Sequence, residues 1–207
     1  MPQTPPSRGN ARQRSKLDTR NRLLDAAADL FAGTGGQRTT MAAIADHAGV
    51  AVGTVYLHFP DKAALLEALL AEALVALKES LAEAASAQTA RTAAQDVRQR
   101  TEGLVAFASD HPRLAAVLFD PANLGSPTGR DTLAFLTASQ AAGLEAGQRR
   151  GWYRKDLPVD LAAAVLVGGL VLAMDGWLRD GGADGDREDG PTLARALADL
   201  RLRGVGA

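Results

Sequence analysis

The chain has 207 residues, no cysteine and a formal net charge of −1 at pH 7. This length allows one large domain or two smaller ones, and the lack of cysteine excludes disulfides and cysteine-based metal sites. Alanine and leucine dominate, aromatic residues make up only 4%, and no β-branched run is long enough for a strand, so we predict an all-α fold.

The first residues, 1–17, are rich in Pro, Ser, Gln, Arg and Gly and cannot build a core. We expect a disordered basic arm, which either stays in solvent or reaches the phosphates or minor groove of DNA. A helix is predicted from Thr19 to Ala32, because Leu23, Ala27 and Phe31 share one of its faces. The glycines that follow Ala32 end this helix.

The stretch from Thr39 to Lys62 predicts two short helices joined by a tight turn. The hydroxyl of Thr39 or Thr40 caps the first helix, and Gly49 can adopt the positive φ that ends a helix abruptly. The second helix spans Val52–His58. The inward-facing residues of the two helices are Met41, Ile44, Ala45, Val55 and Phe59.

Small and polar groups are left on the outer face of the second helix, and Tyr56 and His58 there can donate to phosphate oxygens. Lys62 falls in the first turn of the next helix, where the helix dipole disfavours a cation unless an anion such as phosphate lies beside it. A plain helical bundle can also contain a helix-turn-helix, so a packing role is the alternative. We favour DNA binding through Thr39, Thr40, Val52, Gly53, Thr54, Tyr56, Leu57, His58 and Lys62.

The segment from Thr19 to Leu70 resembles the N-terminal domain of TetR-family transcriptional regulators. The resemblance covers about a quarter of the chain. Ala51 departs from the family pattern, because a serine or threonine often caps the second helix at this position. The matching residues are Arg20, Leu23-Leu24, Ala26-Ala27, Leu30-Phe31, Gly35, Thr39-Thr40, Ile44-Ala45, Ala48-Gly49-Val50, Gly53-Thr54-Val55-Tyr56, His58-Phe59, Lys62 and Leu65-Leu66.

A long helix follows, capped by Asp61 and running to about Ala84, and its helical spacing of leucines is sustained throughout. A helix of this length can couple the N-terminal part of the chain to the remainder. Capping residues, prolines and glycines divide the remainder into five further helices. We expect these at Ala93–Ser109, Pro112–Phe119, Pro127–Arg149, Val159–Arg179 and Pro191–Arg203.

The helix at 159–179 is apolar on almost every side, so we expect it to be buried nearly all round. Its most apolar stretch, Leu161–Met174, is bounded by aspartates and is shorter than a membrane span, so we expect no membrane. Complete burial of one helix in a small all-helical body suggests a second subunit, and the resemblance implies that this helix and the one at 191–203 pair with their copies in a homodimer. The alternative is the central helix of a monomeric bundle.

A ligand cavity between the later helices would hold a small hydrophobic effector of unknown identity, because few aromatic or charged residues are available to line it. The alternative is that most candidate lining residues belong to the core, and for any single residue we favour the core. The candidates are Phe107, His111, Leu118, Phe135, Gln140, Met174 and Trp177.

No motif in the sequence predicts catalysis, a cofactor or a metal. The three histidines lie far apart, and neither a P-loop nor a GxSxG or GxGxxG motif occurs. The acidic, glycine-rich segment 180–190 resembles the start of a calcium loop but lacks the closing glutamate, so we interpret it as a solvated linker. We therefore expect a protein that is not an enzyme.

Charge is distributed unevenly along the chain. Eight basic residues face five acidic ones up to Lys62, which gives this part +3 and leaves −4 for the remainder. A basic end suits a polyanionic partner. No apolar segment follows the first basic residues, so we expect no secretory signal and a cytoplasmic protein.

Taken together, these features predict an arm at 1–17, a three-helix DNA-binding head at 18–64 and an effector-binding and dimerisation domain at 65–207. The resemblance implies a transcriptional regulator, most simply a repressor that a small effector releases from a near-palindromic operator. The alternative is an architectural or cell-cycle DNA-binding factor that has the same head but no effector.

Overall fold

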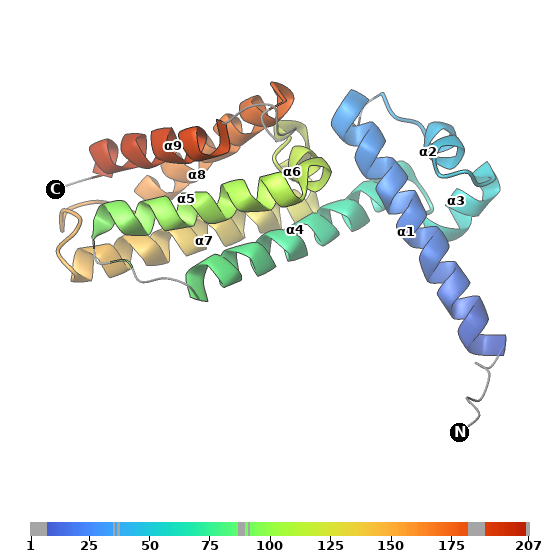
Figure 1. Cartoon of the computed structure of the whole chain (residues 1–207), viewed down its shortest axis with the longest axis horizontal. Coiled ribbons are helices and arrows are strands. Elements are labelled where there is room, and N and C mark those ends of the chain that lie inside the picture. Colours follow the sequence, from blue (N-terminus) through green and yellow to red (C-terminus); the bar gives the residue numbers. More distant parts are fainter. Residues whose placement is uncertain are drawn as a thin grey trace. The chain divides into compact units, whose positions relative to one another are not determined.

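A computed structural model describes residues 8–34, 36, 38–86, 90, 92–181 and 189–205. Within these residues the fold is all-helical, as predicted, with nine α-helices, one short 3-10 helix and no strand (Figure 1). The chain divides between Leu69 and Leu70 into two compact units. We call them the N-terminal unit and the C-terminal unit and describe each by itself. The functional domain boundaries at 18–64 and 65–207 stay predictions.

The N-terminal unit is built from α1 (Arg8–Thr34), α2 (Met41–His47) and α3 (Val52–His58), and it includes the start of α4 (Lys62–Ser86). One face of α1 is fully buried at Leu23 and Ala27. Ile44 of α2 and Val55 of α3 are each 0% exposed, so the three helices share one core. Gly49 has a φ of 65°, and its conformation allows the abrupt turn between α2 and α3.

Helix α1 begins much earlier than predicted. We expected a disordered arm as far as residue 17, whereas the helix starts at Arg8, and residues 1–7 lie outside the described part. The reason is that extending an existing helix costs far less than nucleating one, and arginine, alanine, glutamine, lysine and leucine all favour helix. Residues 13–18 are exposed, so this extension contributes to the surface and not to the core.

The C-terminal unit contains the rest of α4 and α5 (Ala93–Asp110), α6 (Pro112–Leu118), η1 (Pro121–Asn123), α7 (Pro127–Arg149), α8 (Val159–Arg179) and α9 (Asp189–Val205). Thr92 and Ser126 cap α5 and α7 with their hydroxyls, and Pro112 opens α6 as predicted. Helix α5 packs along α9 and α7 packs along α8 (Figure 1). The helices expected from the sequence are therefore all present.

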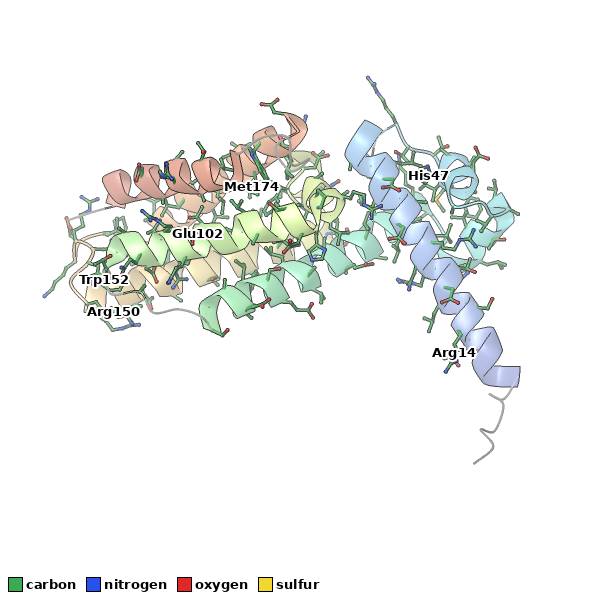
Figure 2. All side chains as sticks on the ribbon, in the orientation of Figure 1. Arg14, His47, Glu102, Arg150, Trp152 and Met174 are labelled. Atoms are coloured by element: carbon green, nitrogen blue, oxygen red, sulfur yellow. The ribbon has the colours of Figure 1, made fainter. Side chains whose placement is uncertain are left out.

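The connection between α7 and α8 packs closely against the bundle. A Cβ atom at Gly147 would lie 2.3 Å from the ring of Tyr153, so only glycine lets this ring lie against α7. Tyr153 joins Leu144, Leu157 and Ala163 in a small core cluster. At the same place, Arg150 lies 4.7 Å over the ring of Trp152, and both are labelled in Figure 2. The start of α8 is thereby fixed to the end of α7.

Within a single chain, helix α8 is buried on one face only, so this chain alone does not supply the burial on nearly every side that we expected. Its inner face is buried, but Leu161, Val165 and Leu172 on the opposite face are each more than 60% exposed. Helix periodicity brings these residues together with Gly168 into one exposed apolar stripe. By length and composition alone α8 could also cross a membrane, a test that core helices of soluble proteins pass as well. This helix is longer than the stretch Leu161–Met174 considered above, and one such helix is weak evidence for a membrane span.

Candidate nucleic-acid interface and ligand cavity

The outer face of α3 carries side chains that do not pack against the rest of the N-terminal unit. Val52 is 42% exposed, Tyr56 53% and Leu57 81%, whereas Val55 on the inner face is fully buried. Thr54 and His58 are half-buried at the edges of this surface. No atom lies within 4 Å of the position that a Cβ at Gly53 would take, so packing does not require glycine there. The helix therefore presents a shallow, mostly apolar face to solvent.

The two threonines before α2 have different roles. Thr40 is the N-cap of α2, and its hydroxyl accepts a hydrogen bond from the backbone N–H of Ala43 at 3.1 Å. Its side chain is exposed and can still donate to an oxygen outside the protein. Thr39 is only 4% exposed, and its hydroxyl donates to the carbonyl of Leu30. Of this pair, Thr40 is the one that an approaching phosphate can reach.

Lys62 is the first residue of α4, as predicted, but its ammonium has partners within the protein. Its ammonium donates to the backbone carbonyls of Gly36 at 2.7 Å and of Thr39 at 3.1 Å. These two oxygens supply the negative partners that we expected from a phosphate at the start of the helix. Lys62 therefore ties the α1–α2 connection to α4, and the cation at this helix start has an explanation within the protein. Sequence reasoning could not find these partners, because they lie more than twenty residues away.

Further contacts fix α2 and the turn before α3. Arg22 on α1 donates from its Nη2 atom to the carbonyl of Ala48, which closes the end of α2. His47, labelled on α2 in Figure 2, lies 3.1 Å from a carboxylate oxygen of Asp29 on α1. The backbone N–H of Val50 donates to the carbonyl of Ala45 at 2.9 Å. Helix α3 is too short to be stable alone, so these contacts hold its exposed face in place.

Two basic residues of α1 lie beside the end of α3, and our predicted site did not include them. Arg20 stacks over the ring of Phe59 with its Cζ atom 5.2 Å from the ring centre. Burial lowers the pKa of His58 below its ordinary value, and the positive charges of Lys16 and Arg20 lower it further. The sequence placed Arg20 on the polar side of α1, but only the fold shows that both cations lie close to His58.

The C-terminal unit contains a cavity of about 110 Å³ between α4, α5, α7 and α8. Most of its wall is apolar, and the polar exceptions are Gln99, Arg100, Ser139 and Gln140. The apolar lining consists of Leu81, Ala84, Ala85, Leu104, Leu136, Val167 and Leu170. A mostly apolar cavity with a few polar groups is the usual form of a small-molecule site.

Comparison with known proteins relates the chain to bacterial regulators. Residues 23–69 match the family model described as "Bacterial regulatory proteins, tetR family". The HTH-type transcriptional repressor KstR2 of Rhodococcus jostii is 30% identical over 177 residues, which cover 81% of this chain and 83% of that protein. A probable acrEF/envCD operon repressor of Escherichia coli is 26% identical over 170 residues, covering 78% of this chain and 77% of the repressor.

The chain belongs to the TetR family. Solved structures agree with this assignment at the level of the fold. FadR from Bacillus halodurans superposes with a TM-score of 0.72 at 19% identity, over 90% of this chain and 95% of FadR. KstR2 of Mycobacterium tuberculosis gives 0.71 at 22% identity, over 91% of this chain and 95% of that chain. This TetR-family protein is thus a DNA-binding transcriptional regulator.

Of the seven residues predicted to line a ligand cavity in this regulator, Gln140 lies on the wall of the cavity described above and the other six do not. Phe107, Leu118 and Met174 are core residues with at most 1% exposure, and the ring of Phe107 packs against those of His111 and Phe119. His111 itself is exposed at the junction of α5 and α6. Large apolar side chains mostly fill the core, so their presence in the sequence does not predict where a cavity lies.

The remaining two candidates also lie away from the cavity wall. Phe135 is half-buried, and the ammonium of Lys78 lies 5.1 Å from its ring centre. Trp177 is half-buried on α8, and its indole N–H has no hydrogen-bond partner within the described residues. The expected acidic linker at 180–190 lies largely outside the described residues. Elsewhere in the described chain no cluster of histidine and acidic residues could hold a metal.

Proposed function

We propose that this TetR-family regulator is a homodimeric repressor that leaves its operator when a small molecule enters the cavity of the C-terminal unit. Each N-terminal unit would place α3 in a major groove, and the two copies would read the halves of a near-palindrome. The observation that carries this proposal is the unused outer face of α3, where Leu57 is 81% exposed although it is apolar.

Base reading would come from Val52, Gly53, Thr54 and Leu57. These residues offer methyl groups and a single hydroxyl, and none can form a bidentate hydrogen bond to a base. Apolar side chains contact the methyl group of thymine, so we expect recognition through such contacts and through DNA shape. Because no protein atom lies close to Gly53, its lack of a side chain is best explained by a close approach of the DNA backbone or a base edge.

Phosphate contacts would come from both sides of α3. Thr40, Tyr56 and His58 can donate hydrogen bonds, and Lys16 and Arg20 add positive charge beside His58. These groups would fix the register of the protein without reading sequence. Lys62 would act indirectly, by holding Thr39 and the start of α2 in place.

Dimerisation would bury the exposed apolar stripe of α8. Leu161, Val165 and Leu172 are large apolar side chains on one solvent-facing side of a helix. Gly168 and Gly169 have no atom within 4 Å of a Cβ position, so a second copy of the helix could approach closely there. The alternative of a buried central helix in a monomer does not account for this exposure. We include α9 in the interface, in keeping with the pairing of the last two helices in this family.

Effector binding is supported by the cavity and by the behaviour of similar proteins. A FadR structure from Bacillus subtilis, 20% identical to this chain with a TM-score of 0.70, is described as a complex with stearoyl-CoA. In this chain the cavity wall includes Leu81 and Ala84 of α4, and α4 begins in the N-terminal unit. A ligand that displaces α4 would thereby favour a state that binds DNA poorly. By linkage, operator DNA would weaken ligand binding by the same factor.

The test is selection of an operator from random duplexes, followed by ligand release. We expect a near-palindromic consensus, and we expect compounds that raise the melting temperature of the protein to lower its affinity for this operator. A consensus that no cavity-binding compound releases would favour an architectural DNA-binding factor instead. Failure to select any sequence would overturn the operator-binding proposal. A repressor of this kind would act in the cytoplasm, where bacterial DNA lies.

A further inference from the structure

The polar groups of the cavity carry information about the ligand, on the basis of the function proposed above. Gln99 of α5 lines the cavity, and its side-chain oxygen is shielded from solvent without a hydrogen-bond partner in the described part of the chain. A buried acceptor left in this state destabilises the protein. Turning the terminal amide about its last torsion is easy, because this torsion has only a broad preference. A ligand with a hydroxyl or N–H group could therefore satisfy this oxygen.

Arg100, which follows Gln99 in the sequence, also lines the cavity, and its positive charge is balanced by a carboxylate. Its Nε atom donates to a carboxylate oxygen of Asp96 at 2.9 Å, and the side chains are 30% and 8% exposed. A Cβ at Gly143 of α7 would lie 2.9 Å from the guanidinium carbon, so the absence of a side chain there provides the space for Arg100. The pair is neutral as a whole. An anionic ligand would add a net negative charge to a mostly apolar cavity, which is unfavourable.

The volume of the cavity limits the size of the apolar part of the ligand. A volume of about 110 Å³ is somewhat below that of the engineered protein cavity of about 150 Å³ that binds benzene. The apolar wall, with Leu104, Leu136 and Leu170 among its members, suits a ring or a short branched chain. A long chain or a fused ring system would require the surrounding helices to separate.

We infer that the cavity selects a small, uncharged ligand in which one apolar ring or short branched chain carries a hydroxyl or N–H group that donates to Gln99. Phenol, toluene and benzoate are suitable probes because they share a ring and differ in one group. Phenol has a donor and is neutral at pH 7, toluene lacks the donor, and benzoate is an anion. Their dissociation constants can be measured on the full chain by ligand-observed NMR.

The expected order of affinity is phenol first, toluene second and benzoate last. One neutral hydrogen bond corresponds to a preference for phenol over toluene of about three- to tenfold. Gln99→Leu keeps a similar volume and removes the shielded acceptor, so we expect a folded protein in which this preference disappears. Gln95→Leu makes the same chemical change one turn earlier on α5, at an exposed position outside the cavity wall, and should keep the preference.

Several outcomes would overturn the inference. Equal affinity for phenol and toluene in the unaltered protein would remove the role of Gln99, as would a preference that survives Gln99→Leu. Tighter binding of benzoate than of phenol would contradict the selection for an uncharged ligand. In each of these cases, release of operator by some other compound would leave the proposed function intact. The proposed function is a separate question. It is wrong if compounds of several classes bind the cavity and none of them changes operator affinity.

Discussion

The two units of this regulator differ in how completely their shielded polar side chains are paired, although buried Thr101 and Thr132 of the C-terminal unit also donate to backbone carbonyls. In the N-terminal unit, the polar side chains that reach inward are paired with backbone carbonyls, as Lys62, Arg22 and Thr39 show. In the C-terminal unit, Gln99 and Trp177 each have a shielded atom that finds no partner within the described residues. The difference teaches that a surface for DNA needs a rigid frame, whereas a ligand cavity benefits from a group that the ligand completes.

The largest effect is expected from a variant that disrupts the proposed dimer without changing the outer face of α3 or the cavity. Val165→Asp places a charge in the exposed stripe of α8, so we expect monomers and a fall in operator affinity of at least about 100-fold, because the two half-sites are no longer bound together. Sedimentation and operator binding measure this. Val75→Asp is the matched control, since Val75 is exposed on α4 outside the stripe. A dimeric Val165→Asp protein would contradict the proposed interface.

The rigid frame of the N-terminal unit can be tested at Lys62. Lys62→Gln removes hydrogen bonds from a charged donor, so we expect a loss of about 1–3 kcal/mol in the stability of this unit. Amide hydrogen exchange in α1–α3 measures this loss. The salt dependence of DNA binding should stay unchanged, because the ammonium of Lys62 donates to backbone carbonyls and does not neutralise a phosphate.

Lys16→Gln is the opposite case, because Lys16 is exposed and belongs to the proposed phosphate-binding set. Stability should be unchanged, and the slope of log affinity against log salt should flatten by about 0.9 for each phosphate that the variant no longer neutralises. Should Lys62→Gln flatten the slope in this way instead, Lys62 would be a phosphate ligand, as the sequence first suggested.

The reading surface can be tested at Leu57. Leu57→Ala removes an exposed apolar side chain, so we expect unchanged stability and a loss of operator affinity of about five- to tenfold, with little change on random DNA. Competition binding on the two kinds of duplex measures this. Leu17→Ala is the matched control, because Leu17 is an exposed leucine on α1 and not on α3. An equal loss on both kinds of DNA would remove Leu57 from the base-reading set.

The smallest expected effect concerns protons. In the free protein the pKa of His58 is lowered, first by burial and then by Lys16 and Arg20, so this side chain is neutral at pH 7. A nearby phosphate would raise the pKa in the complex, so the complex binds more protons than the free protein. Operator affinity should therefore rise by a few-fold as the pH falls from about 7.5 to 5.5. His58→Gln should reduce this rise, and an unaltered pH profile would separate His58 from the phosphates.

Local sequence patterns predicted the helices and the helix-turn-helix because the determinants lie close together in the chain. Thr40 caps α2 through Ala43, three residues away, and Gly49 adopts its turn conformation by itself. These features need no knowledge of distant residues. The predicted start of α1 was wrong. We interpreted a segment that cannot build a core as disordered, although its residues favour extension of a helix.

Features that depend on packing between distant segments could not be predicted in the same way. The partners of Lys62 lie on a loop far earlier in the chain, and the cavity needs residues from α4, α5, α7 and α8 together. Most candidate lining residues were large or aromatic. Such side chains usually fill the core, as Phe107 and Met174 do. Gln140 was the exception. For α8 the sequence predicted burial on nearly every side, but an apolar sequence does not tell which neighbour covers which face.

The brevity of α3 has a consequence for how such regulators diverge. Of its seven residues, only Val55 is buried. The other positions can change with little effect on folding, while a peptide of these residues alone would not keep a helical shape. New operator preferences can therefore arise by exchanging a few surface residues on an inherited frame, but transplanting the preference into an unrelated protein would require the whole N-terminal unit.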